Sequence, residues 1–518
     1  MSEENSLSRR DVLRSLVASG AAASLAGVGL APSGARAETP KRGGRIRVAS
    51  VSSSTADTLD PAKGALSTDY ARHYMIYSGL TRYDANLTPQ LALAEDIQDS
   101  GRILWTIKLR KGVQFHDGKP LTPADVVYSL MRHKVASTGS KMKTIAEQFE
   151  EVRATGPNEV QIRLSGANAD LPAILADSHF LIVKDGTTDF RTAIGTGPYR
   201  CKEFNPGVRT VGVRNPNYWQ SGKPYLDEIE LVGISDESAR VNALLSGDVQ
   251  MINAVHPLST RRVKASGSHV FLETKSGNYT SLILRQDMLP TRDPDFVLAM
   301  KYLLDRELIR KALFHGFATV ASDQPIPPGN RYYFEGLPQR PHDPDRARFH
   351  LKKAGLSGAR LVVYASPAAE GSVDMASLLQ LSAAEVGLKI AVNRVPADGY
   401  WSNHWMKHPL GFGNTNPRPT ADLLFSSLFK SDAPWNESGW KSERFDQLLL
   451  AARGEADEVK RKQMYCDMQV LVHERCGLGI PVFISLMDAY DKRLKGFGSI
   501  PIGGLMGYSF ADYVWLDA

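Results

Sequence analysis

The order of helix-type and strand-type patterns along the chain constrains its fold more than any other feature of the sequence. Residues 45–51 alternate polar and apolar side chains, as a strand with one buried face does. Residues 295–313 instead place apolar side chains at helical spacing. Because the two patterns follow one another without a regular repeat, the sequence predicts an α/β protein of several subdomains.

Local signals also predict individual elements. Thr122, Pro123 and Asp125 are typical of a helix start, with an N-cap, a first-position proline and a first-turn acid. Residues 360–395 read as a β–α–β unit, which predicts a parallel pair of strands with a crossover helix. The other expected strands are 104–109, 159–164, 209–213, 226–234 and 249–254, and the other expected helices are 236–246, 442–453 and 455–475.

The size of the chain exceeds one ordinary hydrophobic core. Its 518 residues predict about two to four core units. Hydrophobic residues make up 42% and charged residues 23%, which excludes a largely disordered chain and a multi-span membrane protein. Lys and Arg number 62 against 56 Asp and Glu, and the net charge of +6 is small for this length. We therefore expect no nucleic-acid partner.

Residues 1–37 have the features of an export signal. Arg9 and Arg10 precede an apolar stretch rich in Ala and Gly, and Ala35-Arg36-Ala37 forms a cleavage site before Glu38. The arginine pair resembles the twin-arginine signal, which exports proteins that are already folded. We expect a soluble periplasmic protein without a lipid anchor, and we expect its three cysteines to be buried thiols: Cys201, Cys466 and Cys476.

The sequence contains no pattern that marks a catalytic site. Gly195-Thr196-Gly197-Pro198 lacks the Lys-Ser/Thr of a phosphate-binding loop and fits a turn between strands. His404 and His408 are four residues apart but lack the glutamate of a zinc-protease motif, and Pro409 ends the element. No G-x-S-x-G motif is present. We therefore predict no catalytic residue, no cofactor and no metal site.

Several sequence motifs occur along the chain in the same order as in a known protein family. The chain resembles the bacterial extracytoplasmic solute-binding proteins of family 5, which serve peptide- and nickel-type ABC importers, including the dipeptide- and oligopeptide-binding proteins. The motifs are Leu59-Asp60-Pro61, Tyr77-Ser78-Gly79-Leu80, residues 109–122 (LRKGVQFHDGKPLT), residues 124–129 (ADVVYS), Gly195-Thr196-Gly197-Pro198-Tyr199 and Asn215-Pro216-Asn217-Tyr218-Trp219.

The resemblance implies a two-lobed periplasmic-binding-protein fold with an extra subdomain and a cleft between the lobes. It further implies a monomer that is not an enzyme. Such a protein captures a peptide or peptide-like solute and delivers it to a membrane-embedded ABC permease with separate ATPase subunits. After the signal at 1–37, the expected parts are lobe I (38–78, 191–285 and 491–518), the extra subdomain (79–190) and lobe II (286–490).

The resemblance also directs attention to a loop of lobe II, residues 411–422. Peptide-binding members place an aspartate there for the ligand ammonium, whereas this chain has Asn414, Thr415 and Asn416. A neutral amide lacks the charge-assisted bond, worth about 1.5–3 kcal/mol. Arg418 could instead bind a carboxylate or phosphate in a bidentate fork. Asp422 could accept an amine, or it could be a first-turn acid of the following helix.

Aromatic residues gather around the same loop, and tryptophan in a closing cleft can stack on a ring or lie over a cation. The alternative for each of them is packing inside lobe II. The expected ligand-binding residues are Trp401, Trp405, Asn414, Asn416, Arg418, Asp422, Trp435 and Asn436.

Alternatives to peptide binding stay open. The same fold could bind an opine-like conjugate, a metal chelate or an oligosaccharide. A more distant alternative is a periplasmic hydrolase, and another is a chemoreceptor or chaperone partner on the same scaffold.

Overall fold

The computed structural model describes residues 39–517, and residues from Pro40 onward form one compact unit. The predicted export signal therefore lies outside the described residues. Within the described part of the chain, no helix is both long and apolar enough to cross a membrane.

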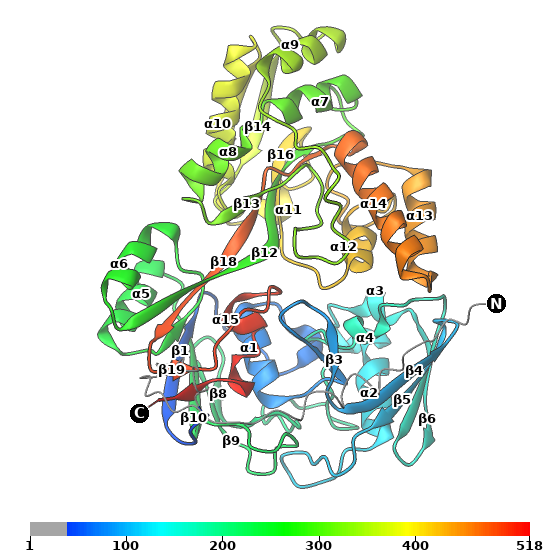
Figure 1. Ribbon diagram of the computed structural model, residues 1–518, viewed down its shortest axis with the longest axis vertical. Helices are drawn as coiled ribbons and strands as arrows, with labels where there is room; N and C mark the ends of the chain where they lie inside the picture. The colour runs from blue at the N-terminus through cyan, green and yellow to red at the C-terminus, as the bar shows by residue number, and fades with distance from the viewer. Residues whose placement is uncertain (1–38, 518) are drawn as a thin grey trace, which may run out of the picture. The chain divides into compact units, whose positions relative to one another are not determined.

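The largest sheet has ten strands and joins segments from most of the chain (Figure 1). β1 pairs in parallel with both β10 and β11, while the other pairings in this sheet are antiparallel. In sheet order, the strands are β16 (Leu410–Thr415), β12 (His269–Leu284), β18 (Val482–Asp491), β11 (Met251–Ile252), β1 (Arg45–Ser50), β10 (Glu228–Gly233), β9 (Arg209–Arg214) and β8 (Tyr199–Asn205), with β13 (Ala318–Val320) on β18 and β17 (Leu478–Gly479) on β12.

Two long neighbouring strands, β12 and β18, connect separate hydrophobic cores (Figure 1). Val482 and Ile484 of β18 pack in the core around β14 and β16, whereas Met487 and Ala489 pack with β1 and β11. The ladder between β12 and β18 shifts register between Thr274 and Asn278, so a bulge lies where the strands pass from one core to the other.

The extra subdomain has its own sheet and core. Its four antiparallel strands run in the order β4 (Ala94–Ser100), β5 (Leu104–Leu109), β7 (Glu159–Leu164) and β6 (Phe149–Gly156). Helix α2 (Pro123–Met131) buries Val126 and Leu130 in this core. It begins as the sequence predicts, after Thr122, and the Asp125 carboxylate accepts hydrogen bonds from the backbone N–H and the hydroxyl of Thr122, both at 2.7 Å. The smaller sheets elsewhere are β2 (Thr81–Tyr83) with β3 (Pro89–Leu91), and β19 (Leu494–Lys495) with β20 (Trp515–Leu516).

The predicted β–α–β unit of lobe II is confirmed. β14 (Arg360–Ala365) and β15 (Lys389–Arg394) pair in parallel, and α10 (Ser372–Glu385) connects them. The remaining helices of four residues or more are α1 (Ser67–Ile76), α3 (Lys143–Ala146), α4 (Leu171–Ile174), α5 (Glu237–Ser246), α6 (Thr260–Ala265), α7 (Pro294–Tyr302), α9 (Pro344–Lys353), α11 (Tyr400–Asn403), α12 (Ala421–Leu428), α13 (Glu443–Gly454), α14 (Glu458–Arg475) and α15 (Gly504–Gly507), besides a π-helical turn, Ile309–Leu313.

Two expectations need correction. The single helix expected over 295–313 is broken: α7 ends at Tyr302, and α8 (Arg306–Leu308) begins after Asp305, whose backbone is extended. The buried Arg306 explains the break, because its guanidinium donates to the carbonyls of Lys301 and Leu304. All three cysteines are free, but Cys201 is only half-buried, since it lies on the edge strand β8.

Candidate functional site

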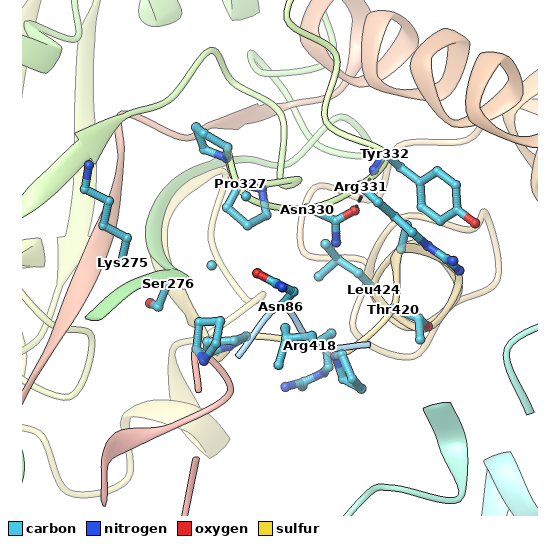
Figure 2. Close-up of a pocket in the computed structure, with 18 of the residues that line it drawn as sticks. Asn86, Lys275, Ser276, Pro327, Asn330, Arg331, Tyr332, Arg418, Thr420 and Leu424 are labelled. Carbon is cyan, nitrogen blue, oxygen red and sulfur yellow. Dashed lines mark hydrogen bonds between the residues drawn. The ribbon is translucent and has the colours of Figure 1, made fainter. Parts of the chain in front are cut away.

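A cavity of about 440 Å³ opens beside the bulge of β12 (Figure 2). Segments far apart in the sequence contribute to its wall. They are the β2–β3 turn (85–89), the β12 bulge (275–277), Thr319 of β13, the loop 325–332, residues 417–421 and Leu424 around the start of α12, and Pro501.

Local chemistry holds these segments in place. In the β2–β3 turn, the Asp84 carboxylate accepts hydrogen bonds from the backbone N–H groups of Asn86 and Thr88, at 2.8 and 2.9 Å. The loop 325–332 contains three prolines, which restrict its backbone. Within that loop the Asn330 side chain accepts from the Tyr332 N–H at 2.9 Å (Figure 2). The wall is therefore largely preformed.

Arg418 is the predicted site residue that lines this cavity. Pro417 and Pro419 restrict the backbone on both sides of it. The guanidinium donates to the Asn416 carbonyl at 3.3 Å and lies 5.8 Å from the centre of the Trp435 ring. Burial lowers the pKa of Arg418, and the charge of Asp177 opposes that shift.

The charged residues of the cavity wall are all basic. They are Lys275, Arg331 and Arg418, and no Asp or Glu is present among the described residues that line it. Figure 2 shows Lys275 on the left and Arg331 to the right of centre, with Asn86 and Arg418 between them. Arg331 also pairs with Asp170 at 3.4 Å.

Three of the four other polar residues predicted for the site have side-chain partners in the protein. Asn414 on β16 donates to the Thr280 hydroxyl at 3.1 Å. Asn416 is exposed, beside Arg418. Asp422 is buried in the first turn of α12 and pairs with Arg453 at 3.0 Å, and burial raises the pKa of its carboxyl. Asn436 is buried and donates to the Trp440 carbonyl at 2.7 Å. Their roles in ligand binding stay predictions.

The three predicted tryptophans lie outside the cavity wall. Trp405 donates its indole N–H to the buried Glu437 at 2.8 Å. Trp401 is exposed and packs edge-on against Trp405. Trp435 is exposed, and its ring lies 5.8 Å from the guanidinium of Arg418, which lines the cavity.

Sequence reasoning missed several residues that line the cavity, namely Asn86, Lys275, Asn330 and Arg331. The run Pro325-Ile326-Pro327-Pro328-Gly329 is a loop signal that could have directed attention to Asn330 and Arg331. Lys275 has no such signal, because its position depends on a bulge that sequence patterns do not reveal.

Solved structures share this architecture. The periplasmic binding protein DppA from Helicobacter pylori, in complex with the peptide STSA, matches with a TM-score of 0.80 at 20% identity, over 92% of this chain and 99% of that one. AgaA from A. tumefaciens R10, in complex with agropinic acid, matches with a TM-score of 0.77 at 22% identity, over 92% and 99%. The fold is therefore the two-lobed fold of periplasmic binding proteins.

Sequence comparison identifies the family. The model of the bacterial extracellular solute-binding proteins, family 5 Middle, matches residues 86–437. The dipeptide-binding protein of Escherichia coli (strain K12) is 26% identical over 473 residues, which cover 83% of this chain and 87% of that protein. The chain belongs to the bacterial extracellular solute-binding proteins of family 5. Members of this family are substrate-binding proteins of ABC transporters rather than enzymes.

Proposed function

We propose that the chain captures a peptide or peptide-like solute in the cavity beside the β12 bulge and delivers it to a membrane-embedded ABC permease with separate ATPase subunits. The observation that carries this proposal is the cavity itself. Its volume of about 440 Å³ falls in the range of about 300–1,000 Å³ that small-molecule sites occupy. The resemblance to the dipeptide-binding protein supports a peptide-sized solute.

A non-peptide solute is the second candidate, and one observation favours it. The described wall of the cavity offers no carboxylate to a free ammonium group. Thr415 pairs within the sheet, and Asn414 is bonded to Thr280. An opine-like conjugate would not need an ammonium partner, and the likeness to AgaA with agropinic acid supports this class. A metal chelate and an oligosaccharide complete the set to be tested.

We further propose that the protein binds without turnover and acts as a soluble, monomeric periplasmic receptor exported by the twin-arginine route. The described residues that line the cavity include no His, Cys, Asp or Glu that could act as a general base or thiol nucleophile. The adjacent Arg9 and Arg10 support the export route.

A thermal-shift screen of the purified protein tests the proposed function. A ligand that binds only the folded state raises the melting temperature by an amount that grows with the logarithm of its concentration relative to its Kd. We expect stabilisation by one of four classes: di- to pentapeptides, opine-like conjugates, metal chelates or oligosaccharides. Mass spectrometry of molecules released by gentle denaturation provides a second readout.

Stabilisation by another class alone would replace the peptide assignment. If no class stabilises the protein and no small molecule is released from it, the receptor function is contradicted. Turnover of a stabilising compound would support the hydrolase alternative instead.

A further inference from the structure

The buried arginines of this protein provide a comparison for Arg418, whose own side chain is half-buried at the cavity wall. Arg72 pairs with Asp57 and Asp69, and Arg306 pairs with Asp323. Arg240 has no carboxylate partner within residues 39–517 but donates to four backbone carbonyls, those of Ile234, Ser235, Asn253 and Ala254. In each case several protein acceptors replace the water that burial removes.

Arg418 has far fewer acceptors. Among the described residues it forms no salt bridge, and its one hydrogen bond is to the Asn416 carbonyl at 3.3 Å. A guanidinium has five N–H donors, so most of its donors have no protein acceptor. Asp177 is near enough to influence the pKa of Arg418, but its carboxylate already pairs with His179 at 2.7 Å.

The surroundings of Arg418 favour an anion at this end of the cavity. Two further cations, Lys275 and Arg331, line the same wall, which has no carboxylate of its own among the described residues. Arg331 also pairs with Asp170, outside the wall, at 3.4 Å, so Lys275 and Arg418 are its cations without a paired carboxylate among the described residues. Helix α12 begins at the wall through Thr420 and Ala421, so its positive end adds to the potential. The Trp435 ring lies 5.8 Å from the guanidinium and limits its freedom before a ligand arrives.

We propose that the solute carries an anionic group, a carboxylate or a phosphate, and that Arg418 binds it while Lys275 and Arg331 supply additional positive potential. This inference rests on the proposed function and narrows its substrate class. The geometry of a guanidinium suits both groups, because each presents two oxygens to parallel N–H donors. Recognition then depends on the anion and not on a free amine.

Matched probes separate the anion from the rest of the molecule. N-acetyl-Ala-Ala has a free carboxylate and no amine, whereas Ala-Ala-amide has the amine and no carboxylate. Glucose 6-phosphate and glucose form the corresponding pair for phosphate. We expect the anionic member of at least one pair to raise the melting temperature of the wild-type protein, and its neutral or cationic partner to have no effect. The active pair identifies the source of the anion.

Variants test the role of Arg418. Calorimetry of the active probe with Arg418→Ala should give an affinity about tenfold or more lower than wild type, because a charge-assisted bond is lost. Arg418→Lys should retain part of the affinity, since it keeps the charge but not the fork. Arg191→Ala is the matched control, because Arg191 is an exposed arginine paired with Asp189 away from the cavity. The melting temperature of each ligand-free variant checks folding.

Each remaining outcome overturns the inference. Equal stabilisation by the anionic member of a pair and by its neutral or cationic partner would show that the anion is not recognised. Unchanged affinity in both Arg418 variants would show that Arg418 does not bind the anionic group. If none of the four probes stabilises the protein, the inference fails, whereas the proposed function fails only if the wider screen and the mass spectrometry are also negative.

Discussion

Glu437 is a carboxyl group buried at the meeting point of two cores. Its oxygens accept hydrogen bonds from the Trp405 indole at 2.8 Å and the Ser281 hydroxyl at 2.9 Å. Burial raises the pKa of Glu437 from its ordinary value of 4.5 to about 7. Gly413 leaves the space for this side chain, because a Cβ at position 413 would lie 1.9 Å from a Glu437 oxygen.

The raised pKa of Glu437 makes the stability of the protein depend on pH. The folded state keeps a proton that the unfolded chain releases above about pH 4.5. The stabilisation from that proton is complete at lower pH and is lost as the pH rises to about 7. Between pH 5 and pH 8, the free energy of unfolding of wild type should fall by about 2–3 kcal/mol more than that of Glu437→Gln. Urea unfolding at each pH measures the difference.

Exposed Glu443 provides the matched control for this measurement. The stability of Glu443→Gln should depend on pH as that of wild type does. Burial also raises the pKa of Asp488 to about 7, so Asp488 contributes to the pH dependence of every variant. Parallel profiles for wild type and Glu437→Gln would mean that Glu437 is not the titrating group.

Single residues of the site were predictable only where a local context marked them. Arg418 was found because the family resemblance pointed to residues 411–422. Lys275 and Arg331 were not, because a bulge in β12 and a proline-rich loop bring them to the same cavity. The burial of Glu437 likewise depends on Trp405 and Ser281, which are distant in sequence.

At the scale of elements, α2 was predictable from neighbouring residues, whereas the end of α7 depends on a contact between residues distant in sequence. The capping residues Thr122 and Asp125 are only three positions apart in sequence, so the start of α2 was predictable. The apolar stripe of 295–313 continues across the break after α7 and conceals it. The break depends on Arg306, whose guanidinium donates a hydrogen bond to the carboxylate of Asp323, a residue distant in sequence, at 2.6 Å. No periodic pattern contains that contact.

The restart of the helix at α8 depends on its N-cap. The Asp305 carboxylate accepts from the Leu308 N–H at 2.8 Å. We expect Asp305→Ala to lower the free energy of unfolding by about 1 kcal/mol, the typical cost of losing such a cap. Denaturant unfolding measures the change. Asp374, an exposed first-turn acid of α10 that is not its N-cap, is the control, and Asp374→Ala should cause a smaller loss than Asp305→Ala, because it removes an interaction with the helix dipole and no capping hydrogen bond. Equal effects of the two substitutions would contradict a capping role for Asp305.

At the scale of the whole molecule, the extra subdomain contacts lobe II next to the cavity. Asp170, before α4, pairs with Arg461 of α14 at 2.8 Å, and both side chains are buried. The Ala169 N–H donates to the Arg453 carbonyl at 2.9 Å, and a Cβ on Gly454 would lie 2.9 Å from the Cβ of Ala167. Asp170 also pairs with Arg331, which lines the cavity. The contact therefore links the subdomain to a wall of the site.

Removing the charge of Asp170 should loosen this contact and release solute faster. Arg461 is buried between Tyr332 and Tyr465, and Asp170→Asn would remove its nearer counter-ion and leave Glu458 at 3.8 Å. Breaking a buried pair costs about 3–5 kcal/mol. We expect faster amide hydrogen exchange in residues 167–170 and 453–461, and faster ligand dissociation, although Asp170 does not line the cavity. Asp189→Asn, in an exposed pair with Arg191, should change neither rate. Faster hydrogen exchange with an unchanged rate of ligand dissociation would contradict this expectation. It would mean that the contact between the extra subdomain and lobe II does not help to retain the solute.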